Sequence, residues 1–95
     1  MDITHCKDSH RFESDLGPDG VAYLAYEPLD AKTLNLQHTV VPDAAQGSGV
    51  GSSLVEAAFT HARENDLRVI PSCPFVADWL DGHPEHLDLV VSAGE

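Results

Sequence analysis

A glycine-rich segment, Gln46 to Gly51, is the part of the sequence whose composition best suits ligand binding. It lies between a predicted strand, residues 33–41, and a predicted helix, residues 49–66. The first N–H groups of a helix have no intrahelical acceptor, and the helix dipole adds positive potential at that end. Because glycine leaves such amides uncovered, we expect a phosphate or pyrophosphate to bind here. A connection that merely turns the chain is the alternative.

The spacing of these glycines differs from two common phosphate-binding motifs. A P-loop requires a Gly-Lys-Ser/Thr sequence, and none follows this segment. In the dinucleotide-binding fingerprint the glycines are spaced differently, and the preceding strand here is the third of an antiparallel series. A phosphate site at this segment would therefore be neither a P-loop nor a dinucleotide-binding fingerprint.

Cys73 is a candidate catalytic residue. It stands at the start of a second predicted helix, residues 73–80, and a helix N-terminus stabilises a thiolate and so lowers the pKa of the thiol. The alternative is a buried, inert thiol, as isolated cysteines commonly are. A disulfide with Cys6 is not expected, because we expect the chain to be cytoplasmic and its thiols reduced.

His38 is the second candidate catalytic residue. Alternation along residues 33–41 places it on the same face as Leu34, Leu36 and Val40. From there an imidazole would act as a general base. A half-buried structural histidine is the alternative.

The other histidines do not have the spacing of a metal site. His83 and His86 flank a Pro-Glu pair close to Asp81 and Asp88, but no fixed tetrahedral pattern supports a metal, so none is predicted. The remaining three are expected at the surface: His5, His10 and His61.

The hydrophobic pattern predicts the elements that must position these residues. Residues 1–9 are expected to be a polar lead-in, followed by an edge strand (10–16) that pairs with the next strand (21–27) across a Gly-Pro-Asp-Gly turn. Residues 28–32 should break the pattern before the third strand. After the long helix come a short strand (67–70), the second helix and a terminal strand or frayed end (87–91). The sequence predicts an α/β fold with a mixed sheet: antiparallel strands, a β-α-β crossover and a second helix.

Length and charge limit the classes of partner. The 95 residues, expected to form a single domain over 1–95, carry 5 Lys and Arg against 16 Asp and Glu, a net charge of −11. So few cations argue against nucleic acid. No apolar run is long enough to span a bilayer, and the N-terminus lacks an apolar signal core, so neither a membrane nor secretion is expected.

At this point the motifs resemble those of the GNAT acyltransferases. Gln46-x-x-Gly49-x-Gly51 is similar to their Q/R-x-x-G-x-G/A signature, and it likewise lies between a strand and a long helix. Residues 67–76, Leu-Arg-Val-Ile-Pro-Ser-Cys-Pro-Phe-Val, resemble the small one-domain subgroup of this family. Trp79-Leu80 and His83-Pro84-Glu85 fit it too, so the similarity covers about residues 11–90.

The resemblance implies that the chain binds acetyl-CoA. The amides of the glycine-rich loop would hold the CoA pyrophosphate. The backbone at the end of the strand 33–41 would hydrogen-bond the pantetheine arm, where this strand splays apart from residues 67–72. Arg63 or Arg68 would either meet the adenosine phosphates or be solvated at the surface. The expected cofactor-binding residues are Thr39, Val40, Val41, Gln46, Gly47, Ser48, Gly49, Val50, Gly51 and Ser52.

The implied activity is N-acetylation of a small or protein-borne amine by a monomer or weak homodimer. Typical GNAT enzymes protonate the leaving thiolate with a tyrosine, but no tyrosine follows Tyr26 here. Cys73, which the splay would bring close to the thioester, would replace that acid or become transiently acetylated. The acidic charge favours a cationic acceptor, or else it is an adaptation to a salty cytoplasm. A non-catalytic CoA-binding or interaction module is the alternative.

Overall fold

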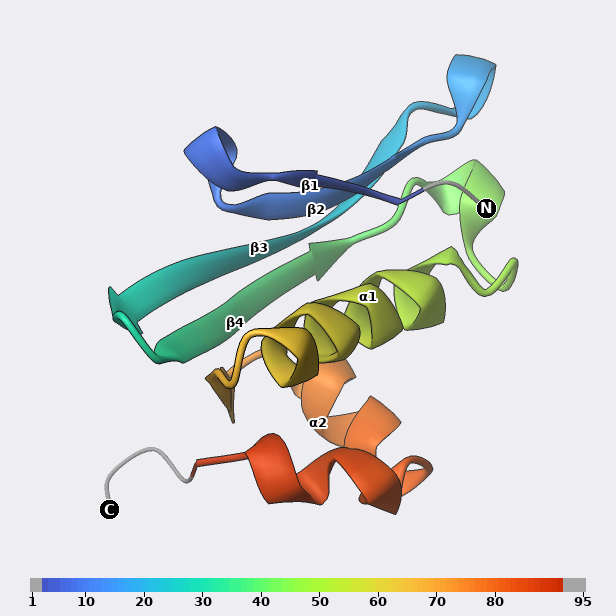
Figure 1. Cartoon of the computed structure of the whole chain (residues 1–95). Helices are drawn as coiled ribbons and strands as arrows, with labels where there is room; N and C mark the ends of the chain where they lie inside the picture. The colour runs from blue at the N-terminus through green and yellow to red at the C-terminus, as the bar shows by residue number, and fades with distance from the viewer. Residues whose placement is uncertain (1–2, 92–95) are drawn as a thin grey trace.

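The computed structural model describes residues 3–91, and its core is a five-stranded sheet in the order β1-β2-β3-β4-β5 (Figure 1). The strands are β1 (Thr4–Cys6), β2 (Arg11–Asp15), β3 (Val21–Asp30), β4 (Thr33–Val40) and β5 (Arg68–Pro71). The helices are α1 (Val50–Glu64) and α2 (Pro74–Asp81), with 3-10 turns η1 (Lys7–Ser9), η2 (Gly17–Asp19), η3 (Asp43–Ala45) and η4 (Pro84–Leu89).

The topology confirms the predicted mixed α/β fold. The first four strands pair antiparallel in chain order, and α1 then carries the chain across so that β5 pairs parallel to β4. Figure 1 shows α1 lying along one side of the sheet with α2 beside it. Within the described residues, neither helix is long and apolar enough to cross a bilayer.

Residues 4–6 correct the expectation of a polar lead-in, because they form an edge strand, β1, that pairs with β2. Ile3 packs against the core, and the ring of His5 stacks on that of Phe12 at a centroid distance of 4.2 Å. A three-residue strand contains too few apolar side chains to show alternation. Its stability comes from contacts with residues far along the chain.

β3, which corresponds to the predicted strand 21–27, extends further than the sequence suggested. β3 continues through Pro28 to Asp30, with an irregularity between these two residues. Pairing of β3 with β2 ends at Ala25, so Pro28 has no partner strand on the β2 side. Because proline has no N–H to donate, it is tolerated at such an unpaired position. Near the C-terminus, residues 84–89 form η4, and the expected strand is reduced to one bridge between Val69 and Val90.

A β-bulge at Gln37 changes the direction of the side chains that follow it in β4. Tyr26 pairs with Leu36, but Ala25 pairs with His38, so Gln37 is an extra residue. The alternation therefore shifts by one position. His38 lies opposite Ala25, on the face away from α1, and not with the buried Leu36 as simple alternation predicted.

The same shift brings Thr39 to the face that α1 covers. Thr39 pairs with Leu24, which is fully buried, and directly opposed residues project to the same side of a sheet. Because of the bulge, the inner face of β4 carries the hydroxyl of Thr39 and not the imidazole of His38.

The core lies between the sheet and the two helices. α1 buries a stripe that includes Leu54, Ala58 and Phe59, and burial of a side chain of Leu or Phe size contributes about 1.5–3 kcal/mol. Phe59 stacks on Trp79 of α2 at 5.5 Å between centroids, and the Trp79 indole N–H donates to Ser52 Oγ at 2.8 Å. These contacts fix α2 against α1.

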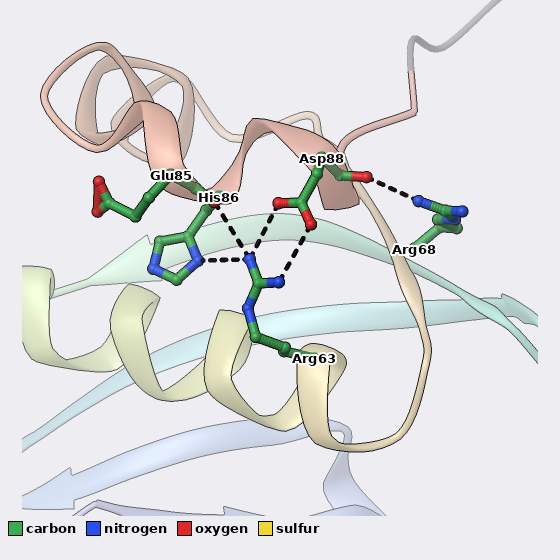
Figure 2. Close-up of polar contacts among 5 residues, drawn as sticks. All are labelled: Arg63, Arg68, Glu85, His86 and Asp88. Carbon is green, nitrogen blue, oxygen red and sulfur yellow. Dashed lines mark hydrogen bonds and ion pairs between the residues drawn. The ribbon is translucent and has the colours of Figure 1, made fainter.

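Arg63 and Arg68 hold the C-terminal segment against the end of α1 (Figure 2). The Arg63 guanidinium donates to both Asp88 carboxylate oxygens, at 2.9 and 3.1 Å, and to the Glu85 carbonyl at 3.2 Å. Arg68 Nη1 donates to the Asp88 carbonyl at 2.7 Å. At 1.5 Å per residue, Arg63 is about 20 Å from the start of α1, too far to meet phosphates bound there. Both arginines thus have partners within the chain, and a role towards the adenosine phosphates stays an untested hypothesis.

His5 and His61 form a contact that joins β1 to α1. Their rings meet edge to face at 4.4 Å, and His5 Nε2 is 2.6 Å from the Tyr26 hydroxyl. Both side chains are half-buried, contrary to the expectation of exposure. Burial lowers the pKa of His5, and the positive charges of His61 and Lys7 lower it further. The pKa of His61 is also lowered, chiefly by burial and then by Lys7.

The lowered pKa values predict that the domain loses stability as the pH falls. The unfolded chain takes up protons more readily at these two histidines, so the stabilisation is complete above their usual pKa of about 6.5 and declines below it. We expect the free energy of unfolding, measured by urea denaturation, to fall between about pH 7.5 and pH 5. In His61→Gln the decline should be shallower.

His10→Asn provides a matched control, since it changes an exposed histidine whose positive φ of 53° asparagine tolerates. It should leave the slope unchanged. An identical slope in His61→Gln and the wild type would contradict the prediction.

Candidate functional site

A pocket of about 750 Å³ opens where β4 ends and α1 begins. Its lining comes from three parts of the chain: the end of β4, the glycine loop with the first turn of α1, and α2. The lining residues are Thr39, Val40, Val41, Ala45, Gln46, Gly47, Gly49, Val50, Gly51, Ser52 and Phe75.

The structure brings together nine of the ten residues that the sequence nominated for cofactor binding. Ser48 is the exception: it does not line the pocket, and its hydroxyl and amide both donate to the Ala45 carbonyl. This places the nominated residues around a single hollow. Their role in binding stays a prediction.

Several backbone amides at this pocket are without an acceptor. Gly47 and Gly49 adopt positive φ values of 85° and 89°, and within the described chain their N–H groups donate to no protein atom. No side chain caps α1, so the amides of its first turn, Val50 to Ser52, are also unpaired. The first bond of the helix is Ser53 N–H to the Gly49 carbonyl, at 3.0 Å. Such a group of amides at a helix N-terminus is suited to a phosphate.

The edge of β4 beside the pocket is unpaired. β5 pairs with β4 only as far as Leu36, opposite Pro71, and the Cys73 amide then donates to the Leu36 carbonyl at 2.9 Å. Beyond that point β5 ends while β4 continues to Val40. The backbone of the last part of β4 is consequently available to an extended ligand that adds as a strand would.

Phe75 of α2 forms a wall of the pocket. Phe75 is 43% exposed and lines the pocket, whereas Trp79 of the same helix is buried. A Cβ atom on Gly51 would lie 2.8 Å from Phe75 Cζ, so the ring occupies space that only glycine leaves free. The helical pattern of residues 73–80 could not have distinguished the two aromatic residues by exposure.

Cys73 does not line the pocket itself, but it contacts Thr39, which does. It is the N-cap residue of α2, as the sequence predicted, and it is 5% exposed. Its Sγ is 3.5 Å from Thr39 Oγ1, and Thr39 is itself a lining residue. Burial raises the pKa of the Cys73 thiol, but hydrogen bonds from the Thr39 hydroxyl and from backbone at Val76, Phe75 and Thr39 outweigh burial, so the pKa is below its usual value.

His38 and the pocket lie on different sides of β4. Its side chain is exposed, and the bulge at Gln37 turns it to the face away from α1. The neighbouring Gln37 amide donates to the Glu27 carboxylate at 3.1 Å on that same face. The two nominated catalytic residues therefore flank β4 from opposite sides.

The described residues show no metal-binding arrangement. No group of three or more His, Cys, Asp or Glu side chains in residues 3–91 is placed to hold an ion. Cys6 and Cys73 are both free thiols.

Three comparisons relate the chain to known proteins. The model of a family described as GCN5-related N-acetyltransferase matches residues 11–89. Protein NATD1 of Xenopus tropicalis is 38% identical over 63 residues, which cover 66% of this chain and 58% of the frog protein. Protein NATD1 of Danio rerio is 32% identical over 92 residues, covering 94% and 84% of the two chains.

A solved structure has the same fold over almost the whole chain. A GCN5-like protein of Staphylococcus aureus, determined by NMR, superposes with a TM-score of 0.75 and 29% identity, covering 99% of this chain and 91% of that one. The frog relative, by contrast, is matched over less than two thirds of its own length.

The environment of Cys73 predicts an acidic thiol. In a Cys6→Ser background, we expect ultraviolet absorbance to show a Cys73 pKa lower than that of an ordinary cysteine thiol. Thr39→Val removes the hydroxyl contact and should raise this pKa. An unchanged pKa in Thr39→Val would show that Thr39 does not stabilise the thiolate.

Proposed function

Since the chain belongs to the GCN5-related N-acetyltransferase family, we propose that it binds acetyl-CoA in the pocket between β4 and α1 and transfers the acetyl group to an amine. The observation that supports this most directly is a single pocket bordered by unpaired helix amides on one side and by a free strand edge on the other. These two features fit the two chemically different parts of the cofactor, its pyrophosphate and its pantetheine arm.

The glycine loop and the first turn of α1 would hold the pyrophosphate. The unpaired N–H groups of Gly47, Gly49 and residues 50–52 are the donors available there, and the helix dipole favours negative charge at this end. The backbone of Thr39–Val41 would pair with the amides of the pantetheine arm. Phe75 would cover the arm from the side of α2.

The thioester end would then lie near Thr39 and Cys73. Acetyl-CoA supplies an activated acetyl group, which leaves the thioester sulfur for the nitrogen of the acceptor amine. The departing sulfur needs a proton, and the Cys73 thiol can provide one through the Thr39 hydroxyl, 3.5 Å from its Sγ. In a covalent variant, Cys73 Sγ itself attacks the thioester carbonyl, releases the CoA thiol, and passes the acetyl group to the amine.

His38 is our proposed base for an acceptor that approaches from the outer face of the sheet. It is exposed on that face, beside the Gln37–Glu27 contact, and it would take the proton that the amine loses. The carboxylate of Glu27 and the net charge of −11 favour a cationic amine, such as a polyamine or a lysine side chain.

A CoA-binding module without catalysis is the second candidate. The observation in its favour is that Cys73 is 5% exposed and that no tyrosine lines the pocket. Such a module would bind acetyl-CoA saturably and show no turnover with any amine.

Incubation with acetyl-CoA and a panel of amines tests the activity. We expect mass spectrometry to show acetylated amine, and kcat to fall at least about tenfold in Cys73→Ala, since positioned proton transfer contributes roughly 10²–10⁴-fold. Cys73→Ser is the matched variant of similar size. Without an amine, an acetyl adduct on the wild type that is missing in Cys73→Ala would identify the covalent route. Saturable binding with no product would establish the module instead.

A pair of substitutions at Gly49 tests the phosphate site. Asparagine and aspartate both tolerate the positive φ at this position, and a Cβ there meets no atom within 4 Å, so both variants should fold. They differ only in charge next to the unpaired amides. We expect calorimetry to show acetyl-CoA bound at least about tenfold more weakly by Gly49→Asp than by Gly49→Asn, the size of one charged contact. Equal affinities would argue against a pyrophosphate at this loop.

A further inference from the structure

The pocket between β4 and α1 contains no charged side chain. Its lining consists of backbone, small apolar residues, a few neutral polar side chains and one aromatic ring. All five Lys and Arg residues of the sequence fall within the described residues, and none of them lines this pocket. This distribution bears on which parts of an anionic cofactor the chain can recognise.

Four of the five cations are at the opposite end of α1. Arg63 and Arg68 are bound to Asp88 and to the carbonyls of the C-terminal segment (Figure 2). Lys32 is in the turn that precedes β4, where its carbonyl accepts from the Arg68 amide. Lys7 belongs to η1 and acts electrostatically on His61, in the last turn of α1.

The fifth cation, Arg11, is held on the outer face of the sheet. It is next to the buried Phe12 and so projects away from α1. Its guanidinium lies over the ring of Tyr23, 4.1 Å from the centroid, and pairs with Glu13 at 3.5 Å. The sheet separates it from the face that α1 covers.

Carboxylates, by contrast, are present at the loop end of the molecule. Asp43 begins η3 and accepts a hydrogen bond from the side chain of Gln46, which lines the pocket. The turn that contains Asp19 packs nearby, since a Cβ on Gly20 would lie 3.5 Å from Pro42. The field around the loop is therefore negative except at the amides themselves.

We infer that the chain does not recognise the 3′-phosphate of CoA, and that thioesters of CoA and of 3′-dephospho-CoA serve equally as its acyl donors. This inference rests on the proposed function. A pantetheine arm that runs along β4 from Thr39 brings the pyrophosphate to the amides first. The 3′-phosphate, on the far side of the ribose, would then lie beyond the amides, and the pocket lining offers it no cation.

Calorimetric titration with acetyl-CoA and with acetyl-dephospho-CoA tests the inference. We expect their dissociation constants to agree within about threefold, because a charged contact to the 3′-phosphate would produce about tenfold or more. An acetyl-CoA affinity more than about tenfold above that of the dephospho form would overturn the inference and leave the proposed function standing. Failure of both ligands to bind would refute the proposed function itself.

Salt dependence provides a second readout. A site that binds phosphates with Lys or Arg loses affinity as salt rises, whereas here screening of repulsion should leave acetyl-CoA affinity unchanged or raise it between about 0.05 and 0.5 M salt. Asp43→Asn keeps the acceptor for Gln46 but removes the charge, and it should leave the ratio of the two affinities as it is in the wild type. A marked loss of affinity with salt would contradict the inference.

Arg11→Gln completes the experiment by removing the one cation on the outer face. The inference predicts the same ratio of the two affinities in this variant and in the wild type. A preference for acetyl-CoA that disappears in Arg11→Gln would overturn the inference and would assign the 3′-phosphate to Arg11.

Discussion

The arrangement of this domain depends on the length of strand pairing along β4. On one side, β3 accompanies β4 to its end, while on the other β5 stops at Pro71, opposite Leu36. The first half of β4 is thus paired with two strands, and the second half is paired with β3 alone. Unpaired backbone beside a hydrophobic core is costly unless water or a ligand satisfies it. The pocket exists because the chain leaves this edge open and then turns, through the glycine loop, into α1.

The helices keep that opening in place. α1 is packed along its buried stripe, and α2 is joined to it by the Phe59–Trp79 stack and the Trp79–Ser52 hydrogen bond. Ser52 also lines the pocket, so the contact that fixes α2 is one residue from Gly51 and the Phe75 ring that packs against it. At the far end of α1, the exposed Arg63–Asp88 ion pair positions the C-terminal segment. It adds little to the free energy of unfolding, since exposed pairs contribute about 0–1 kcal/mol.

The elements of the fold followed from periodicity, whereas the details of the site did not. Alternation and the glycine spacing located β4, the loop and α1 to within two residues, because those patterns reflect local backbone chemistry. The bulge at Gln37 is different in kind: it is set by the register with β3, which no single strand encodes. It reversed the expected side of His38 and brought Thr39 to Cys73. The wall role of Phe75 depended likewise on a partner, Gly51, from another helix.

The two outer edges of the sheet are both short. β1 is only three residues long. The edge of β5 away from β4 is covered by the Val69–Val90 bridge and by the Val91 amide, which donates to the Val69 carbonyl at 2.9 Å. Long unprotected edges invite other chains to pair, and short or covered ones resist this. In the described domain, the unpaired edge at the end of β4 lies inside the sheet, next to the end of β5, and not on either outer strand. Short outer edges limit pairing with other chains, while the inner edge at the end of β4 stays open.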